Sequence, residues 1–341
     1  MPTPAIAQGA PQVPYLEKWQ GSPHANKAAE SFRHWDKDGK VPKACATCHS
    51  SDGYLDFLGA DGSTMGKVDA SHSTDTVITC TTCHNDETLI MTEVTFPSGA
   101  MVADAGRSMR CMVCHQGRQS GPGVHKAHKG LDPDTVSDKV KFQNVHYRAA
   151  GATMYGTLVK GGYEYPGQSY KGQFKHVEGF AACSECHDAH STKINPEQCA
   201  VCHKKARTGD LDRIRVTAGD FDGDGNGAEG IAMEIDGLHS RLYAAMQGYA
   251  KTVAKTPIVY DSHTYPYFFT DLNANGRIDE DEAKYPNAYK SWTPRLAKAA
   301  YNYQFVAKDP GGYAHNGMYM VQLLFDAITD LNGDSGRMNR P

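Results

Sequence analysis

The sequence has no cysteine outside one repeated pattern. Its 341 residues include ten cysteines, and all ten belong to five pairs of the form CxxC. No cysteine is left for a disulfide framework, a separate zinc site or a catalytic thiol. One kind of cysteine chemistry must therefore account for all ten.

Three further shortages narrow the class of protein. No run of 18 apolar residues occurs, which excludes a transmembrane helix on sequence grounds. The formal net charge is −4 and no basic block is present, so nucleic acid is not the expected partner. Leucine, isoleucine and valine are sparse for this length, and two ordinary hydrophobic cores would be hard to build from them.

A histidine directly follows every cysteine pair. The five motifs are Cys45, Cys48 and His49; Cys80, Cys83 and His84; Cys111, Cys114 and His115; Cys183, Cys186 and His187; and Cys199, Cys202 and His203. Two cysteines at this spacing can each form a thioether bond to a haem vinyl group, and the histidine is then held beside the iron. A zinc knuckle or a thioredoxin-like pair is the alternative, but five pairs cannot combine evenly into zinc sites and neither needs this histidine. We predict five covalently bound haems c.

Four segments around these motifs resemble stretches of bacterial multihaem (pentahaem) c-type cytochromes of the respiratory and extracellular electron-transfer type. They are residues 32–50, 110–119, 144–165 and 292–316. The resemblance covers most of the chain and implies electron transfer along closely packed haems. It favours a fold of mainly α-helix and coil, with few or no strands and a haem stack as the core.

The second axial position of each iron separates an electron carrier from an enzyme, because an open position can bind a small molecule. Sixteen histidines are present, and eleven remain after the five proximal ones. The predicted distal ligands are His24, His34, His146, His176, His190 and His315. His190 lies three residues after His187 and would have to serve a neighbouring haem. His146 and His176 lie in a 68-residue interval without a haem motif, and His315 precedes a predicted helix.

The choice of His24 as a candidate ligand depends on a helix predicted over residues 23–35. Ser22 followed by Pro23 is a good cap and first-turn pair, and the helix would place His24 and Trp35 on one stripe. His34 would face another direction.

The other spare histidines are predicted to be surface or hydrogen-bonded residues. They are His72, His125, His128, His239 and His263. Methionine is the competing axial ligand, but the 12 methionines are expected to pack against porphyrin faces instead.

Residues 271–282 match the calcium loop D-x-[DN]-x-[DN]-G-x₅-E in full. The predicted ligands are Asp271, Asn273, Asn275, Arg277 through its carbonyl, Asp279 and Glu282. A solvated Asn-Gly turn is the alternative interpretation. A structural calcium would attach a haem-free segment to the haem core.

A second segment begins in the same way. Its candidate ligands are Asp220, Asp222, Asp224 and Asn226. Ile231 stands where the loop needs glutamate, so Glu229 or Glu234 would have to complete the site.

The chain divides by composition into a haem-binding region, residues 1–210, and a haem-free region, residues 211–341, with the calcium loops. Helices are predicted in the second region over residues 237–254, 294–306 and 317–331. Thr293 followed by Pro294 marks the start of the second helix.

The resemblance implies a periplasmic or extracellular location, because haem is attached after export in this family. No apolar run precedes Gln8, and the sequence around Ala5 and Ala7 is typical of the end of a removed signal sequence. Redox proteins with basic patches or extracellular acceptors are the expected partners, and self-association into filaments is a further hypothesis.

The expected function is electron transfer without catalysis. A haem enzyme with one open site, like pentahaem nitrite reductases and hydroxylamine-oxidising proteins, is the alternative. Those reductases typically carry a CxxCK motif, and this chain has none.

Overall fold

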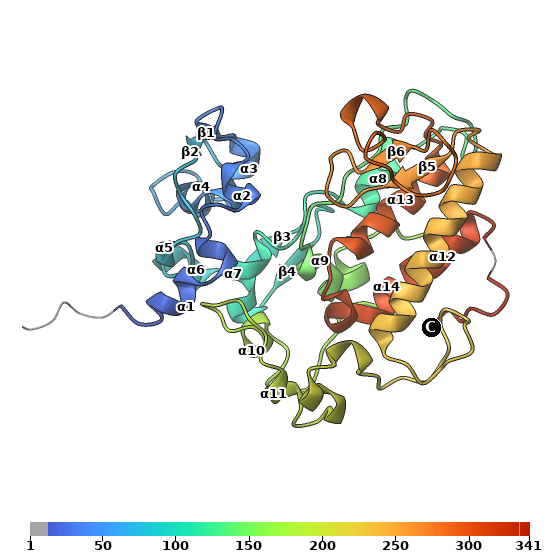
Figure 1. Ribbon diagram of the computed structural model, residues 1–341. Coiled ribbons are helices and arrows are strands. Elements are labelled where there is room, and N and C mark those ends of the chain that lie inside the picture. The colour runs from blue at the N-terminus through green and yellow to red at the C-terminus, as the bar shows by residue number, and fades with distance from the viewer. Residues whose placement is uncertain (1–12, 334) are drawn as a thin grey trace, which may run out of the picture. The chain divides into compact units, whose positions relative to one another are not determined.

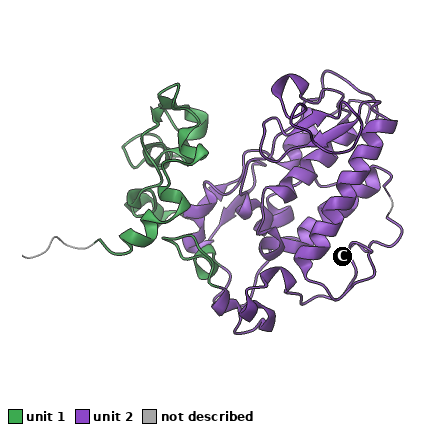
Figure 2. Cartoon of the chain, viewed as in Figure 1, with its two compact units in different colours: residues 1–91, 182–195 green, residues 92–181, 196–341 purple. Residues whose placement is uncertain are grey.

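The computed structural model describes residues 13–333 and 335–341, and Figure 1 shows the order of the elements along the chain. The sequence around Ala5 that suggests a signal remnant lies outside the described residues. The chain forms two compact units, Met1–Met91 with Ala182–Asn195, and Thr92–Ala181 with Pro196–Pro341 (Figure 2). The predicted boundary at residue 210 separates the part of the chain with haem motifs from the part without them. It is not a boundary between compact units, and it stays a prediction.

The first unit is made of short helical pieces joined by coil. Its helices are α1 (Leu16–Gln20), η1 (Pro23–Ala25), α2 (Glu30–Arg33), α3 (Lys43–His49), α4 (Ser51–Leu58), α5 (Cys80–Cys83), α6 (Asp86–Ile90) and α10 (Cys183–Cys186). One buried apolar cluster joins Phe32, Val77 and Ile78, with Trp19 and Ala29 packed against it. Such a small cluster agrees with the sparse aliphatic content.

The predicted helix over residues 23–35 is wrong. Only η1 and α2 form there, and Asn26 separates them in an extended conformation with ψ of 90°. The side chain of Asn26 accepts a hydrogen bond from the amide of Ala28 at 3.0 Å, which offers the backbone a turn in place of a helix. Ser22 does not cap η1 through its side chain.

The second unit contains the long helices and most of the apolar core. Its helices are η2 (Gly106–Ser108), α7 (Met109–Met112), α8 (Gly121–Ala127), α9 (Ala150–Tyr155), η3 (Gly156–Leu158), α11 (Pro196–Cys199), η4 (Lys204–Thr208), η5 (Leu211–Arg213), α12 (Ile231–Thr252), η6 (Tyr285–Asn287), α13 (Pro294–Ala307) and α14 (Gly312–Asp330). Helices α12, α13 and α14 pack together, and Leu238, Leu296 and Met320 are fully buried among them. This bundle forms the apolar core of the unit.

The helices predicted for the C-terminal region are confirmed, with shifted starts for two of them. Helix α13 begins as predicted, because the Thr293 side chain accepts from the amide of Leu296. Helix α12 starts at Ile231 instead of residue 237. Helix α14 starts at Gly312, and it is interrupted at Asn316, whose side chain caps the following segment by accepting from the amide of Tyr319 at 3.2 Å.

Strands are few and short, as predicted. Three antiparallel pairs occur in the described residues: β1 (Lys40–Val41) with β2 (His72–Ser73), β3 (Glu93–Thr95) with β4 (Met101–Ala103), and β5 (Ile258–Tyr260) with β6 (Phe268–Thr270). The fold is therefore mainly helix and coil.

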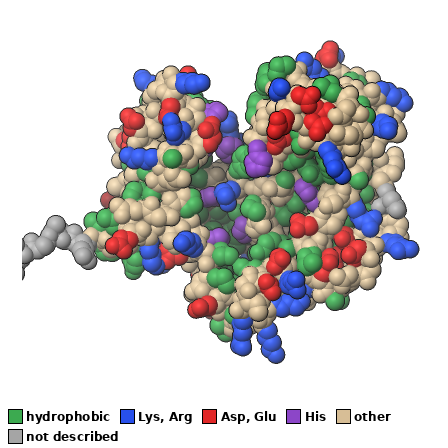
Figure 3. Space-filling view, in the orientation of Figure 1, with side chains coloured by type: hydrophobic (Ala, Val, Ile, Leu, Met, Phe, Trp, Pro, Cys, Tyr) green, Lys and Arg blue, Asp and Glu red, His purple; other side chains and the backbone are tan. Residues whose placement is uncertain are grey.

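Two properties of the molecule bear on its surroundings. Among the described residues, no helix combines the length and apolarity needed to cross a bilayer. On the face shown in Figure 3, acidic and basic side chains are intermixed and histidine side chains reach the surface.

Candidate haem sites and calcium loops

Short helical turns carry the CxxCH motifs. In four of them the histidine amide donates to the carbonyl of the first cysteine, four residues earlier, at 2.8–2.9 Å; these are His84, His115, His187 and His203. The fifth motif lies within α3. Residues i, i+3 and i+4 share one face of a helical turn, so each turn presents both sulfurs and the imidazole on the same side.

None of the ten cysteines is fully buried, although the degree of exposure differs among them. Cys80, Cys186 and Cys202 are exposed, and the half-buried ones are Cys45, Cys48, Cys83, Cys111, Cys114, Cys183 and Cys199. Cys48 lies inside α3, one residue before its end, whereas Cys202 follows α11 in a turn where its amide donates to the carbonyl of Cys199 at 3.2 Å. Both thiols are therefore accessible, but haem attachment through Cys48 and Cys202, as through the other eight cysteines, stays a prediction.

Three proximal imidazoles are oriented by a hydrogen bond at Nδ1. His49 Nδ1 lies 2.7 Å from the carbonyl of Ser31, and His187 Nδ1 lies 3.0 Å from that of Thr192. His115 Nδ1 lies 3.0 Å from the carbonyl of Arg148. Because a carbonyl can only accept, each Nδ1 carries the proton and leaves the lone pair of Nε2 for a metal.

Two proximal histidines face a distal candidate at the spacing of axial ligands. The ring centroids of His84 and His190 are 6.1 Å apart with planes inclined by 6°, and those of His176 and His203 are 5.9 Å apart and inclined by 52°. A bond from a metal to imidazole nitrogen is about 2 Å long, so two imidazoles on opposite sides of one metal have centroids about 6 Å apart. Both pairs match this value.

Residues around His190 hold it in place from two sides. The Tyr15 ring stacks on the imidazole at 4.5 Å, and the Asp188 carboxylate accepts from the amide of His190 at 3.1 Å. Lys18 donates to Asp188 at 2.7 Å, and this bond is the main cause that holds the pKa of the Asp188 carboxyl far below its usual range. The loop after His187 is therefore fixed by an ion pair.

His315 and His115 lie near each other in the second unit. His115 is half-buried, burial lowers the pKa of its imidazole, and positive charge on His315 lowers that pKa further. His315 Nδ1 contacts both carboxylate oxygens of Asp309, at 3.0 and 2.9 Å. His115 Nδ1 contacts the Arg148 carbonyl, and the Arg148 amide donates to the carbonyl of Lys308, the residue before Asp309, at 2.8 Å. These backbone contacts bring the segments of His115 and Asp309 together, and the pairing of His115 with His315 stays a prediction.

The other three distal candidates are placed as follows. His34 Nδ1 contacts the Glu30 carboxylate at 2.8 Å on the surface, and this leaves Nε2 as its metal-binding nitrogen. His24 is in η1 and its carbonyl accepts from the amide of Ile78. His146 is half-buried in a segment held through Val145, which donates its amide to Gln304. All three stay predictions.

Three histidines predicted to be non-ligands use Nε2 in hydrogen bonds within the protein. His72 Nε2 lies 2.8 Å from the buried Asp56 carboxylate, His128 Nε2 lies 3.3 Å from the Lys141 carbonyl, and His239 Nε2 lies 2.9 Å from the Tyr303 carbonyl. The remaining two, His125 and His263, are exposed.

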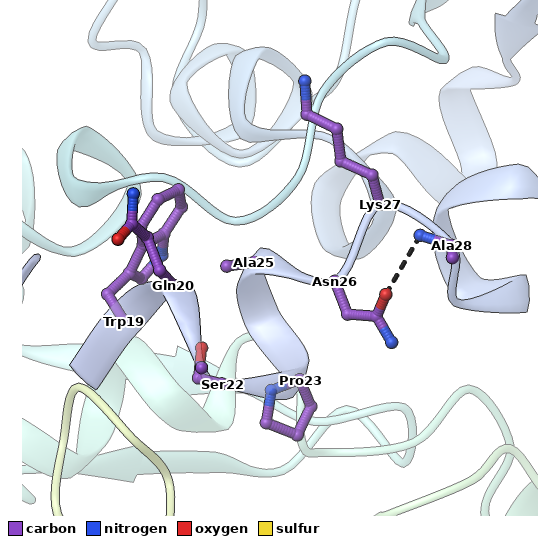
Figure 4. Close-up of a pocket in the computed structure, with 9 residues that line it drawn as sticks. Trp19, Gln20, Ser22, Pro23, Ala25, Asn26, Lys27 and Ala28 are labelled. Atoms are coloured by element: carbon purple, nitrogen blue, oxygen red, sulfur yellow. Dashed lines mark hydrogen bonds between the residues drawn. The ribbon is translucent and has the colours of Figure 1, made fainter. Parts of the chain in front are cut away.

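A hollow in the first unit suits a flat apolar group with an acidic edge. Its volume is about 680 Å³, and residues 19–23 and 25–28 line it (Figure 4). Trp19, Pro23 and Ala28 supply apolar surface, and Lys27 supplies a positive charge. The hydroxyl of Ser22 is buried with no hydrogen-bond partner among the described residues. A porphyrin with its carboxylates satisfies both the apolar and the polar requirements.

The loop 271–282 folds around two buried carboxylates. Asp271 accepts from the amides of Asn275 and Gly276, at 3.2 and 2.8 Å, and Glu282 accepts from those of Leu272 and Asp279, at 2.7 and 3.2 Å. Their residues are 4% and 1% exposed, and neither carboxylate forms an ion pair within the described part of the chain.

Among the described residues, the carboxylates of Asp271, Asp279 and Glu282 do not all come within 4.8 Å of one another. The amides of Asn273 and Asn275 both reach one oxygen of Asp279, at 2.8 and 2.9 Å. Gly276 has a φ of +78°, the left-handed conformation needed at the sharp turn of a calcium loop. Oxygen ligands of this number and charge fit calcium.

The second acidic segment brings together more carboxylates than the motif alone predicts. Carboxylate oxygens of Asp220, Asp222 and Asp224 lie within 4.8 Å of one another, and so do those of Asp222, Glu229 and Glu234. Burial, together with neighbouring carboxylates, raises the pKa of Asp222. Because α12 begins at Ile231, Glu234 points back at the loop from the first helical turn, in the place that the missing glutamate would take.

Relatives of known type extend over most of the chain. The C-type polyheme cytochrome OmcB of Geobacter sulfurreducens is 27% identical over 369 aligned residues, which cover 88% of this chain and 45% of OmcB. The C-type polyheme cytochrome OmcC of the same organism is 29% identical over 387 residues, covering 94% of this chain and 47% of OmcC. The chain therefore spans about half the length of these curated relatives. No protein-family model matches the chain, and no solved structure does.

Both relatives are named for several haems of the c type, and covalent attachment of such haems is what the CxxCH turns provide. The similarity covers 88% and 94% of the chain, so the chain is similar to bacterial multihaem c-type cytochromes over most of its length.

Proposed function

We propose that this chain carries electrons through five haems c, each ligated by two histidines. The main support for this proposal is the distance of about 6 Å between the ring centroids in two histidine pairs. Each pair joins one CxxCH histidine to one histidine that the sequence analysis predicts as a distal ligand. When bound, each haem iron supplies a one-electron Fe(III)/Fe(II) couple, and two axial imidazoles leave no position for a substrate.

Three haems receive complete axial pairs in this proposal. The pairs are His84 with His190, His203 with His176, and His115 with His315. His49 and His187 would take their partners from His24 and His34, which lie in the same unit.

One loop would link two haems. His187 ligates the haem of its own motif, and His190, three residues later, ligates the haem of Cys80 and Cys83. Two irons served by residues this close along the chain must have neighbouring porphyrins, and electron transfer between them would be short in range. The ion pair between Lys18 and Asp188 fixes this loop.

A coulometric titration tests the proposal. Purified protein should contain five haems by pyridine haemochrome analysis and mass spectrometry, and should take up five electrons per chain from dithionite. Fewer than five covalent haems would contradict the assignment of the motifs. Oxidation of the reduced protein by nitrite with turnover would favour the open-site enzyme instead.

One half-buried and one exposed cysteine offer a direct check of the thioether bonds. C48A and C202A should each leave one vinyl group of one haem unattached, because the second cysteine of that motif is lost. The pyridine haemochrome band of either variant should shift to longer wavelength for one haem in five. An unchanged spectrum would contradict attachment at the substituted cysteine.

A structural calcium in the loop 271–282 is part of the proposal. Two buried carboxylates in one loop need a counter-charge, and calcium would supply it through their oxygens. The segment Asp220–Asn226, completed by Glu234, is the second calcium site. Arg215 already pairs with Glu234, and calcium would balance the charge of the remaining carboxylates.

The same similarity to polyheme cytochromes supports proposals for location and partners. We place the protein in the periplasm or outside the cell, where haem attachment would be complete. Redox proteins with basic patches or extracellular acceptors would receive its electrons. Self-association into filaments stays a prediction from the sequence, and electron microscopy at high protein concentration would reveal it.

A further inference from the structure

His315 has a charged hydrogen-bond acceptor at Nδ1, whereas the oriented proximal histidines have neutral ones. His49, His115 and His187 each donate to a backbone carbonyl. His315 donates to Asp309, and both carboxylate oxygens lie within 3.0 Å of Nδ1. The Asp309 side chain is only 3% exposed, so water screens its charge weakly.

Asp309 is held in this position by the turn between α13 and α14. Its carbonyl accepts from the amide of Gly312 at 2.9 Å, and the amide of His315 donates to the carbonyl of Gly311 at 3.0 Å. A Cβ at Gly311 would lie 2.9 Å from Cε1 of His315, so only glycine lets the backbone pass this close to the ring.

The neighbouring cation does not neutralise this carboxylate. Lys308 Nζ donates to the Asn144 side chain and to the Val145 carbonyl, at 2.9 and 2.7 Å. Among the described residues, His315 is the ion-pair partner of Asp309. The negative charge therefore acts mainly on the imidazole.

A carboxylate acceptor makes the imidazole a stronger electron donor at Nε2, because charge-assisted hydrogen bonds polarise the ring more than neutral ones do. Greater donation stabilises Fe(III) relative to Fe(II), and second-shell hydrogen bonding is an established determinant of haem potential. We propose that Asp309 lowers the midpoint potential of the haem held by Cys111, Cys114 and His115. The couple takes one electron, from the reductant or a neighbouring haem, and the Nδ1 proton stays on His315.

This inference rests on the proposed ligation of that haem by His115 and His315, and Asp309 acts as a positioning residue through His315. The test is a spectroelectrochemical titration of the purified holoprotein and its D309N variant. Asparagine can still accept from Nδ1 but carries no charge. We expect one of the five midpoints to rise by at least 59 mV, which is a tenfold change in a one-electron equilibrium, while the other four stay in place.

Two further variants serve as controls. D309E retains a carboxylate and should keep the low midpoint better than D309N. The inference can therefore still be tested with D309E if D309N fails to fold. E280Q removes an exposed carboxylate outside the proposed haem sites, so no midpoint should move. The loss of haem from any variant is checked by pyridine haemochrome analysis.

Failure of the inference and failure of the ligand assignment give different results. If H315A produces one high-spin ferric haem but D309N leaves all midpoints unchanged, the role of Asp309 is overturned and the axial pair stands. If H315A leaves every haem low-spin, the axial pair itself is wrong and the inference is overturned with it.

Discussion

At the scale of single residues, the two nitrogens of each imidazole separate structural histidines from candidate ligands. Oriented ligand candidates use Nδ1 for the protein, as His187 does with the Thr192 carbonyl and His315 with Asp309. The structural histidines His72 and His239 use Nε2 instead. Under the proposed ligation iron would bind Nε2, so the nitrogen that each ring uses in its hydrogen bond distinguishes a ligand candidate from a structural histidine.

The assignment of His190 predicts a defined spectroscopic change. H190A should leave the haem of Cys80 and Cys83 with one axial ligand, and ferric EPR should show one of five haems converted to the high-spin state. H263A changes an exposed histidine that is not a ligand candidate, and it should leave all five spectra as in the natural protein. A fully low-spin H190A protein would contradict the pairing with His84.

The buried pair of Asp56 and His72 predicts acid sensitivity of the first unit. Burial acts to raise the pKa of Asp56, but hydrogen bonds from His72, Ser63 and the amides of Asp69 and Ala70 outweigh it and leave the pKa below the usual 3.8. A lowered folded-state pKa contributes stability that is complete above the unfolded-state pKa and disappears as pH falls through the folded value.

Thermal unfolding measured from pH 7 to pH 2 checks the direction of this pH dependence of stability. The natural protein should be more stable than D56N at neutral pH. The gap should begin to shrink near pH 3.8, where the carboxyl of the unfolded chain takes up a proton, and should close only below the lower folded-state pKa, where Asp56 is neutral in both states. A gap that stays constant over this range would show that charge on Asp56 does not contribute.

At the scale of elements, local signals in the sequence predict well only where tertiary structure does not compete. Thr293 and Pro294 locate the start of α13 because cap and first turn are adjacent in the chain. The same reasoning fails at Ser22, where Asn26 forms a turn of its own. The sequence left Glu229 and Glu234 as alternatives in the second acidic loop, and the structure brings carboxylate oxygens of both near that of Asp222.

The loop 271–282 predicts one bound calcium that depends on Glu282. Equilibrium dialysis followed by metal analysis should show that E282Q binds one calcium fewer than the natural protein, because the last position of the loop supplies two oxygens. E280Q is the matched control, since Glu280 is exposed and occupies no ligand position. Chelation should also lower the melting temperature of the natural protein, by the linkage between binding and folding. Equal calcium content in E282Q and E280Q would contradict calcium binding by the loop 271–282.

At the scale of the whole molecule, the sequence determines the number of haem motifs but not which histidines meet. The CxxCH pattern is local, so five attachment sites follow from it directly. His84 and His190 are 106 positions apart, and only the fold brings their rings to 6.1 Å. The contact between Asp309 and His315 was also missed, because a spacing of six residues does not reveal the turn that joins α13 and α14.

The central claim is that all five irons have two histidine ligands and the protein carries electrons without catalysis. Low-temperature EPR of the fully oxidised protein, with haem concentration measured in the same sample, tests it most directly. The account predicts five low-spin ferric haems per chain and no spectral change on adding nitrite. A high-spin haem in the natural protein, or a shift of any signal with nitrite, would contradict it.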